Sequence, residues 1–225
     1  MIIDNPFDIL DSYLDLTLSA LTDNDWNILE YLSHHTDYEV RLYLAEVLSY
    51  FHCLNSENIL MKMLDDTEIL VVSSACDSLS FSDSLQVFDA LNKCTKSSHF
   101  IIRGYAYMSI GEILSRKVVK INDLDYFSCF LKREKSVWVK ASIAYLLCIN
   151  DYHDNVNYII NLLNNRYYSY RLYALNLIDS LLKKSISIDK QYIRHILLLR
   201  IKIEKNRVVY SRITEIIESY QKTIP

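Results

Sequence analysis

Apolar residues recur along this chain in six short blocks of the same form. Each block has an aliphatic residue, or once a tyrosine, at a position that we number 0, and small or apolar residues at positions 4 and 8. The six blocks are Val40–Leu44–Leu48, Val71–Ala75–Leu79, Ile102–Ala106–Ile110, Val139–Ile143–Leu147, Tyr170–Ala174–Ile178 and Val209–Ile213–Ile217. Because positions 0, 4 and 8 share one face of an α-helix, each block predicts an amphipathic helix.

The blocks are spaced almost evenly along the sequence. Successive starts are 31, 31, 37, 31 and 39 residues apart. A period of this length is typical of a solenoid of stacked helix pairs. The predicted fold class is therefore all-α, an α-solenoid of about six helix pairs. The residues of the first four blocks, from Val40 to Leu147, are expected to be buried.

A first helix is expected before each block, which itself forms the second helix of its pair. The predicted first helices are 25–33, 56–64, 84–93, 122–132, 154–163 and 189–202. Each opens with Asp, Ser or Asn, residues that are preferred at helix N-termini.

An N-terminal capping helix is expected over 7–21, where apolar residues recur at steps of three and four. The residues of this stripe are Phe7, Leu10, Leu14, Leu18 and Leu21. The chain, 1–225, is predicted to be a single solenoid domain with its cap within 1–22 and its repeats within 25–220.

Composition narrows the classes of function. Glycine and proline occur twice each, and no G-x-G-x-x-G or G-x-x-x-x-G-K pattern is present, which argues against the usual nucleotide sites. The five cysteines are an odd number without a C-x-x-C pair, so we expect reduced thiols and neither a metal nor another cofactor. No secretory signal is visible, and no uncharged apolar run approaches the ~20 residues that span a bilayer. A cytoplasmic protein without membrane association is expected.

Charge is distributed unevenly between the two ends of the sequence. Residues 1–100 contain 17 acidic and 4 basic residues, a balance of −13, whereas residues 101–225 contain 11 acidic and 20 basic residues, a balance of +9. Because a solenoid lays its sequence out along its axis, this predicts an acidic end and a basic end. Two interpretations of this charge difference are open. It is either a variation of the solvent-exposed surface without a function, or a means by which the acidic end attracts a basic partner.

Two segments carry a resemblance to a known repeat family. Position 1 of the block is often basic, as in Arg41 and Arg103, and position 9 is often small, as in Ser49 and Gly111. The segment from Asp37 to Ser49 resembles the HEAT-repeat family, and Ile102 to Gly111 resembles it again. The resemblance extends over about 25–220. It implies that the second helices line a concave groove, and it implies no activity.

Positions 2, 6 and 9 of each block would then point into the groove. None of these eighteen residues is Lys or Arg, and five are acidic. Such a groove should repel a phosphate backbone and attract a basic protein surface, so nucleic-acid binding is not expected. The candidate partner-binding residues are Tyr43, Glu46, Asp77, Tyr105, Met108, Glu112, Tyr145, Tyr173 and Asp179. The tyrosines have an equally physical alternative role, which is packing against a neighbouring repeat.

Three functions remain open at this point. A short HEAT solenoid with an acidic groove resembles the α-helical immunity proteins of bacterial toxin systems, including contact-dependent growth inhibition. That resemblance implies a non-enzymatic cytoplasmic protein that blocks a cognate toxin, such as a basic nuclease domain. A monomer is expected. The second possibility is a scaffold or assembly factor that bridges two proteins through its two ends. The third is a HEAT-like DNA glycosylase, in which Asp77 or Asp179 would stand for the catalytic acid by analogy, but the expected groove charge disfavours it.

Overall fold

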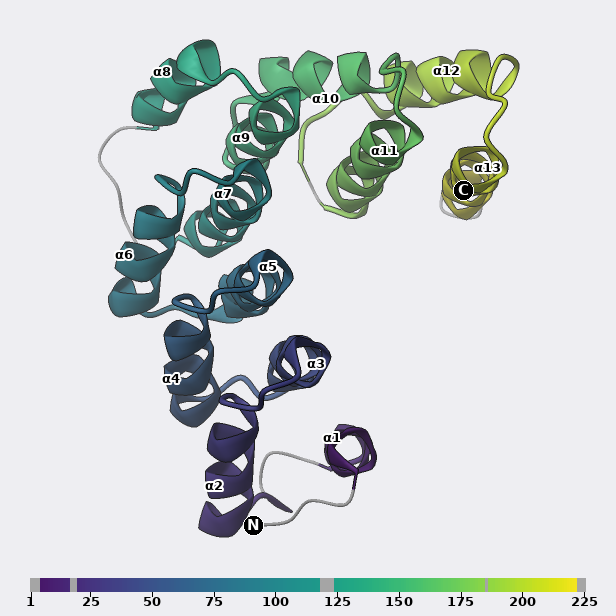
Figure 1. Cartoon of the computed structure of the whole chain (residues 1–225). Coiled ribbons are helices and arrows are strands. Elements are labelled where there is room, and N and C mark those ends of the chain that lie inside the picture. The colour runs from purple at the N-terminus through teal and green to yellow at the C-terminus, as the bar shows by residue number, and fades with distance from the viewer. Residues whose placement is uncertain (1–4, 17–19, 118–123, 185, 222–225) are drawn as a thin grey trace. The chain divides into compact units, whose positions relative to one another are not determined.

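The structure is a computed structural model that describes residues 5–16, 20–117, 124–184 and 186–221 (Figure 1). Every regular element within these ranges is a helix, and the helices form pairs, which confirms the predicted all-α solenoid. The six pairs found in the described residues each contain one predicted first and one predicted second helix. The chain divides into two compact units, Met1–Ile121 and Asn122–Pro225.

Unit 1 contains the acidic end of the sequence. Its elements are α1 (Pro6–Leu14), α2 (Asp23–Leu32), α3 (Tyr38–Leu48), α4 (Leu54–Met63), α5 (Ile69–Ser78), the short 3₁₀-helix η2 (Leu79–Phe81), α6 (Leu85–Cys94) and α7 (Phe100–Ser115). Helices α1, α3, α5 and α7 pack in sequence against one another as one layer, and α2, α4 and α6 form the other (Figure 1). The second helices of three repeats therefore stand side by side.

Unit 2 contains the basic end of the sequence. Its elements are α8 (Asp125–Arg133), α9 (Val137–Ile149), the 3₁₀-helix η3 (His153–Asn155), α10 (Val156–Leu162), α11 (Tyr168–Lys183), α12 (Lys190–Ile201) and α13 (Arg207–Gln221). Helices α9, α11 and α13 pack in sequence, and α8, α10 and α12 each pack on the second helix of their own pair. Unit 2 thus repeats the arrangement of unit 1.

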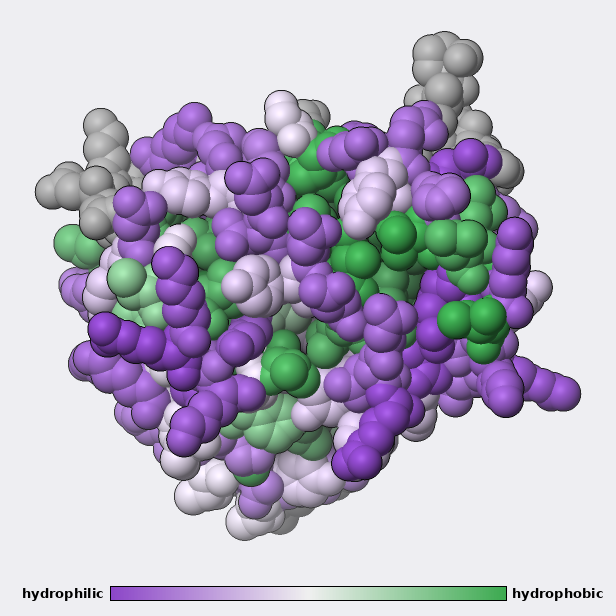
Figure 2. Space-filling view, turned by 90° about the horizontal axis from the view of Figure 1, so that it is seen from above, coloured by the Kyte–Doolittle hydropathy of each residue, from purple (hydrophilic) through white to green (hydrophobic). Residues whose placement is uncertain are grey.

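The predicted core is confirmed in every block that was assigned to it. All twelve residues from Val40 to Leu147 at positions 0, 4 and 8 are buried. Hydrophilic side chains cover most of the face seen in Figure 2, with hydrophobic ones exposed between them. In the part of the chain that the structure describes, no helix combines the length and the apolar character needed to cross a membrane.

The capping helix is shorter than predicted. Helix α1 begins after Asn5, whose side chain accepts a hydrogen bond from the Phe7 N–H, and it ends at Leu14. Leu10 is buried as expected, but Leu14 is exposed, and Leu18 lies outside the described residues. Tyr13 is buried in place of Leu14, and its hydroxyl donates to Asp25 at 3.0 Å. This contact ties α1 to the first turn of α2.

A polar turn joins the two helices of every repeat. The side chain five residues before position 0 accepts a hydrogen bond from the backbone N–H two residues later. The acceptors are His35, Asp66, Ser97, Glu134, Asn165 and Glu204. These bonds replace partners that the backbone loses where one helix ends and the next begins.

The basic residue at position 1 reinforces this turn. Arg41 donates to the carbonyls of His35 and Thr36 in its own turn, and it forms a two-pronged ion pair with Asp66 in the turn of the next repeat. The side chains of both partners are largely buried. We call this arrangement the inter-repeat clamp. It explains why an arginine is favoured at position 1, since its fork of donors reaches both turns at once.

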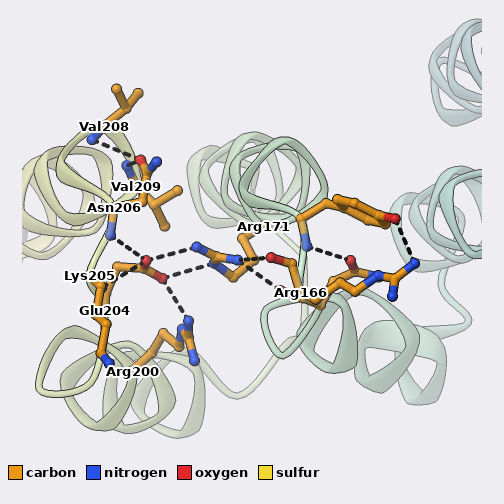
Figure 3. A network of polar contacts seen from close by, with 10 residues as sticks. Arg166, Arg171, Arg200, Glu204, Lys205, Asn206, Val208 and Val209 are labelled. Carbon is orange, nitrogen blue, oxygen red and sulfur yellow. Dashed lines mark hydrogen bonds and ion pairs between the residues drawn. The ribbon is translucent and has the colours of Figure 1, made fainter.

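Another inter-repeat clamp lies in unit 2 and centres on Glu204 (Figure 3). Arg171 donates to both carboxylate oxygens of Glu204 at 2.9 and 2.8 Å, and to the carbonyls of Asn165 and Arg166. Arg200 donates to Glu204 at 2.7 Å, and the backbone N–H of Asn206 donates at 2.8 Å. The Glu204 side chain is almost completely buried, so its charge depends on these partners.

Acidification tests the role of the Glu204 charge. Burial raises the pKa of Glu204, but hydrogen bonds from Arg171, Asn206 and Arg200 outweigh it and lower the pKa to about 2. A carboxyl group with a lowered pKa in the folded protein adds stability above its unfolded pKa, and this stability is lost as the pH falls through the folded pKa.

We therefore expect the free energy of unfolding to be higher for the parent protein than for the Glu204→Gln variant, and the difference to be constant above about pH 5. The difference should shrink as the pH falls toward about 2. Urea titrations at a series of pH values measure it. The same difference at neutral pH as near pH 2 would contradict this role.

Candidate functional site

A hollow of about 650 Å³ opens on unit 1, on the side of the second helices. It is formed by α3, α5, α7 and η2 together with the turn after α3. Its lining residues are Leu42, Glu46, Ser49, Tyr50, His52, Leu70, Ser73, Ser74, Asp77, Ser78, Ser80, Phe81 and Tyr105. The set includes two of the predicted acidic residues and one predicted tyrosine, and it contains no Lys or Arg. We call this feature the acidic hollow.

The carboxylates come together because the repeats are in register. Glu46 and Asp77 occupy position 6 of successive blocks, and α3 packs against α5, so both side chains reach the same hollow. Both residues are exposed. Burial by the surrounding walls raises the pKa of the solvent-accessible Asp77, and the nearby charge of Glu112 on α7 raises it further. The acidic hollow therefore holds negative charge that an added cation would stabilise.

Aromatic and apolar side chains complete the walls of the acidic hollow. Burial raises the pKa of Tyr105, and the charge of Asp77 adds to this effect. His52 stacks on Phe81 with ring centroids 4.3 Å apart. Tyr50 is 70% exposed, and Leu70 is also exposed. Carboxylates beside aromatic rings can hold a lysine or arginine side chain by both charge and cation–π attraction.

Other predicted residues of unit 1 lie outside the lining of the hollow. The Tyr43 hydroxyl donates to Asp11, and the Tyr43 ring packs against Phe7 with centroids 6.0 Å apart. Tyr43 therefore fastens α1 to α3, in line with the alternative role of the tyrosines. Met108 and Glu112 are half-buried on α7.

The predicted outward orientation is wrong for two residues of unit 2, Tyr145 and Asp179, which are both buried. Tyr173, a candidate partner-binding residue at position 3, is buried as well, in line with the alternative packing role of the tyrosines. Tyr145 lies on α9, whose residues 141–149 are buried on every side because no charged side chain follows Lys140 in this helix. These residues are not available to a partner.

Tyr173 and Asp179 have internal partners instead. The Tyr173 ring stacks on Trp138 at 3.6 Å, and its hydroxyl lies 2.7 Å from the Ser142 hydroxyl. Asp179 accepts from Arg212 at 2.7 Å and from Lys183 at 2.8 Å. The groove of unit 2 was expected to contain no Lys or Arg. A second hollow of about 470 Å³ between α11 and α13 is nevertheless lined by Arg212, which occupies position 3 of its block.

Several lining residues of the acidic hollow were missed by the sequence interpretation. Tyr50 and His52 lie in the turn after α3, and Phe81 lies in η2, so none of them occupies a counted groove position. Leu70 lies one residue before position 0 of its block. Their common signal is a large apolar or aromatic residue within four positions of a block. No group of three or more metal-ligating side chains with suitable placement occurs among the described residues.

Comparisons with known proteins give a structural likeness only. No protein-family model matches the chain, and no curated protein matches it. Among solved structures, an archaeal HEAT-like repeats protein from Thermococcus onnurineus NA1 has 12% identity and a TM-score of 0.42, and all of each chain is covered.

Two further structures show the same degree of similarity. Human deoxyhypusine hydroxylase has 10% identity and a TM-score of 0.44, with 96% of each chain covered. A phycocyanin lyase complex from Nostoc sp. has 12% identity and a TM-score of 0.44, covering 91% of this chain and 98% of that one.

Proposed function

We propose that this chain is a non-enzymatic protein-binding solenoid whose acidic hollow binds a basic segment of a partner protein. The observation that carries the proposal is the lining of the hollow, in which Glu46 and Asp77 stand among aromatic and apolar side chains without a Lys or Arg. A volume of about 650 Å³ accommodates one or two long side chains of a partner.

The mode of binding follows from the lining. A lysine or arginine of the partner would place its charged group between Glu46 and Asp77. Its apolar stem would lie against Leu42 and Leu70, and aromatic side chains of the partner could pack on Tyr50. The surplus of negative charge in the first hundred residues would steer such a partner toward unit 1 and raise the association rate at low salt.

We further propose that the partner is a bacterial toxin with a basic nuclease domain, and that this chain acts in the cytoplasm as its immunity protein. A nuclease must line its substrate cleft with Lys and Arg to hold a phosphate backbone. The carboxylates of the acidic hollow would bind these basic residues and so compete directly with the nucleic acid. Enzymatic chemistry has no part in this proposal.

Charge reversal in the acidic hollow tests the proposal. The variant Glu46→Lys/Asp77→Lys should bind a purified nuclease toxin domain, first of all one encoded by the neighbouring gene, at least about 30-fold more weakly than the parent. The parent should inhibit the nuclease, and the variant should not. Surface plasmon resonance measures the affinity, and circular dichroism verifies that the exposed substitutions leave the fold intact.

A control variant separates the acidic hollow from net charge. Asp15→Lys/Asp89→Lys changes the net charge by the same amount at exposed positions outside the hollow. It should lose less than about threefold in affinity. Equal losses in the two variants would show that net charge acts without the hollow. A lysine-rich helical peptide serves as a second probe, and failure to bind either this peptide or any nuclease domain would refute the proposal.

A further inference from the structure

Helix α12 carries a second apolar stripe that the fold does not use. Ile193 and Leu197 on one side of the helix are buried, and α12 packs against α13. Tyr192, Ile196 and Leu199 follow each other at steps of four and three, which places them together on a different face. Ile203 continues this face after the helix end, where its N–H still donates to the Arg200 carbonyl. We call these four residues the α12 stripe.

The α12 stripe is accessible to a partner. Tyr192 is 43% exposed, Leu199 48% and Ile203 63%, while Ile196 is half-buried. Figure 2 shows hydrophobic surface between hydrophilic side chains toward the right of the view, where α12 lies in Figure 1. Aliphatic residues repeated on one exposed helix face mark an interaction site more often than scattered apolar residues do.

The surroundings of the stripe are positively charged. Residues 190–207 contain six Lys or Arg and a single acidic residue, Glu204, whose charge is held by Arg171 and Arg200. Lys202, Lys205 and Arg207 are exposed, and no ion pair to them occurs in the ranges that the structure describes. A ligand that fits this surface must therefore combine apolar side chains with negative charge.

We propose that the α12 stripe docks an acidic amphipathic helix of a second partner protein. Apolar residues spaced by three and four along that helix would cover Tyr192, Leu199 and Ile203, and its carboxylates would pair with Lys202, Lys205 and Arg207. A second copy that paired through the same stripe would bring like charges together, which disfavours a symmetric dimer as the occupant. Tyr192 is the single aromatic side chain of the stripe and the other three are aliphatic, so successive nucleic-acid bases would not find a series of rings to stack on.

This surface is independent of the acidic hollow, because it lies on unit 2 and has the opposite charge. With both sites occupied, the chain would bridge a basic and an acidic protein. The proposed function does not require the second site, and the second site does not require a toxin.

The test uses a designed peptide and the full chain. The peptide is an 18-residue helix with leucines at steps of four and three on one face and glutamates on both flanks. The counterpart has lysines in place of the glutamates. We expect the glutamate peptide to bind with micromolar affinity in fluorescence anisotropy, at least tenfold more tightly than the lysine peptide, and to weaken as salt is added.

Substitutions locate the site. Leu199→Ser/Ile203→Ser should weaken binding of the glutamate peptide at least tenfold. Leu54→Ser/Leu85→Ser removes two leucines of unit 1 that are similarly exposed, and this variant should bind the peptide like the parent. Circular dichroism verifies the fold of each variant. Glu46→Lys/Asp77→Lys should bind the glutamate peptide like the parent, so the two proposals can fail separately.

Three results would overturn the inference. The first is absence of binding of the glutamate peptide, or binding that the stripe variant leaves unchanged. The second is a dimer in sedimentation experiments that Leu199→Ser/Ile203→Ser dissociates, which would make a second copy the occupant. The third is tighter binding of a single-stranded RNA oligonucleotide than of the peptide, with loss of both in the stripe variant.

Discussion

Replacing Arg171 with methionine should lower the free energy of unfolding by about 3–5 kcal/mol, because it removes one partner of a buried ion pair. The substitution leaves the buried carboxylate of Glu204 with Arg200 as its remaining charged partner. It also removes the donor to the carbonyls of Asn165 and Arg166. Methionine keeps the length of the arginine stem, so the loss reports on the guanidinium group. Urea unfolding at neutral pH measures it.

A double variant distinguishes the clamp from general packing. Arg171→Met/Glu204→Met removes both charges, and it should recover a large part of the loss, since a buried pair replaced by apolar residues is often close to neutral in stability. Arg166→Met is the matched control, because Arg166 is exposed and its guanidinium lies over the exposed ring of Tyr167. A loss of less than about 0.5 kcal/mol for Arg171→Met, the range of ordinary surface changes, would show that the inter-repeat clamp does not hold the repeats together.

The repeat architecture could be read from the sequence because one physical requirement recurs six times. Each second helix must bury positions 0, 4 and 8 against its neighbours, and this leaves a period that local irregularities do not hide. The predicted start of α2 differs from the observed one by two residues. Asp25, expected to open α2, is the third residue of that helix and forms a reciprocal capping box with Thr22. Both residues are common at helix N-termini, so the sequence does not rank them.

The polar turn shows what a residue pattern cannot reveal. Its acceptor is His35, Asp66 or Ser97 in the first three repeats, and a carboxylate or amide in the others. Only the position of the acceptor is shared, whereas the residue type changes from repeat to repeat. The role of Arg41 and Arg171 became visible only in the structure. Each pairs with a carboxylate of the next repeat, 25 residues away for Arg41 and 33 residues away for Arg171, and no local pattern indicates such a pair.

The candidate site was predicted in part for a related reason. Glu46 and Asp77 were placed correctly because charged residues at outward positions stay exposed when helices stack in register. Tyr173 and Asp179 occupy positions that were also expected to be accessible, but Trp138 and Arg212 cover them. Aromatic and arginine side chains are long enough to reach across a repeat, and a position count along one helix does not include such neighbours.

Leu48→Ala should cost about 2–5 kcal/mol of unfolding free energy, because Leu48 is 0% exposed and its truncation leaves a cavity between stacked helices. Leu54→Ala is the matched control, since this leucine lies six residues later and is 67% exposed. It should cost less than about 0.5 kcal/mol. The comparison tests the register of the repeat, because a shift of α3 by two residues would turn position 8 toward solvent. Urea unfolding followed by circular dichroism gives both values. Equal losses in the two variants would mean that position 8 does not face the core, and the outward direction of Glu46, which depends on the same register, would then be wrong as well.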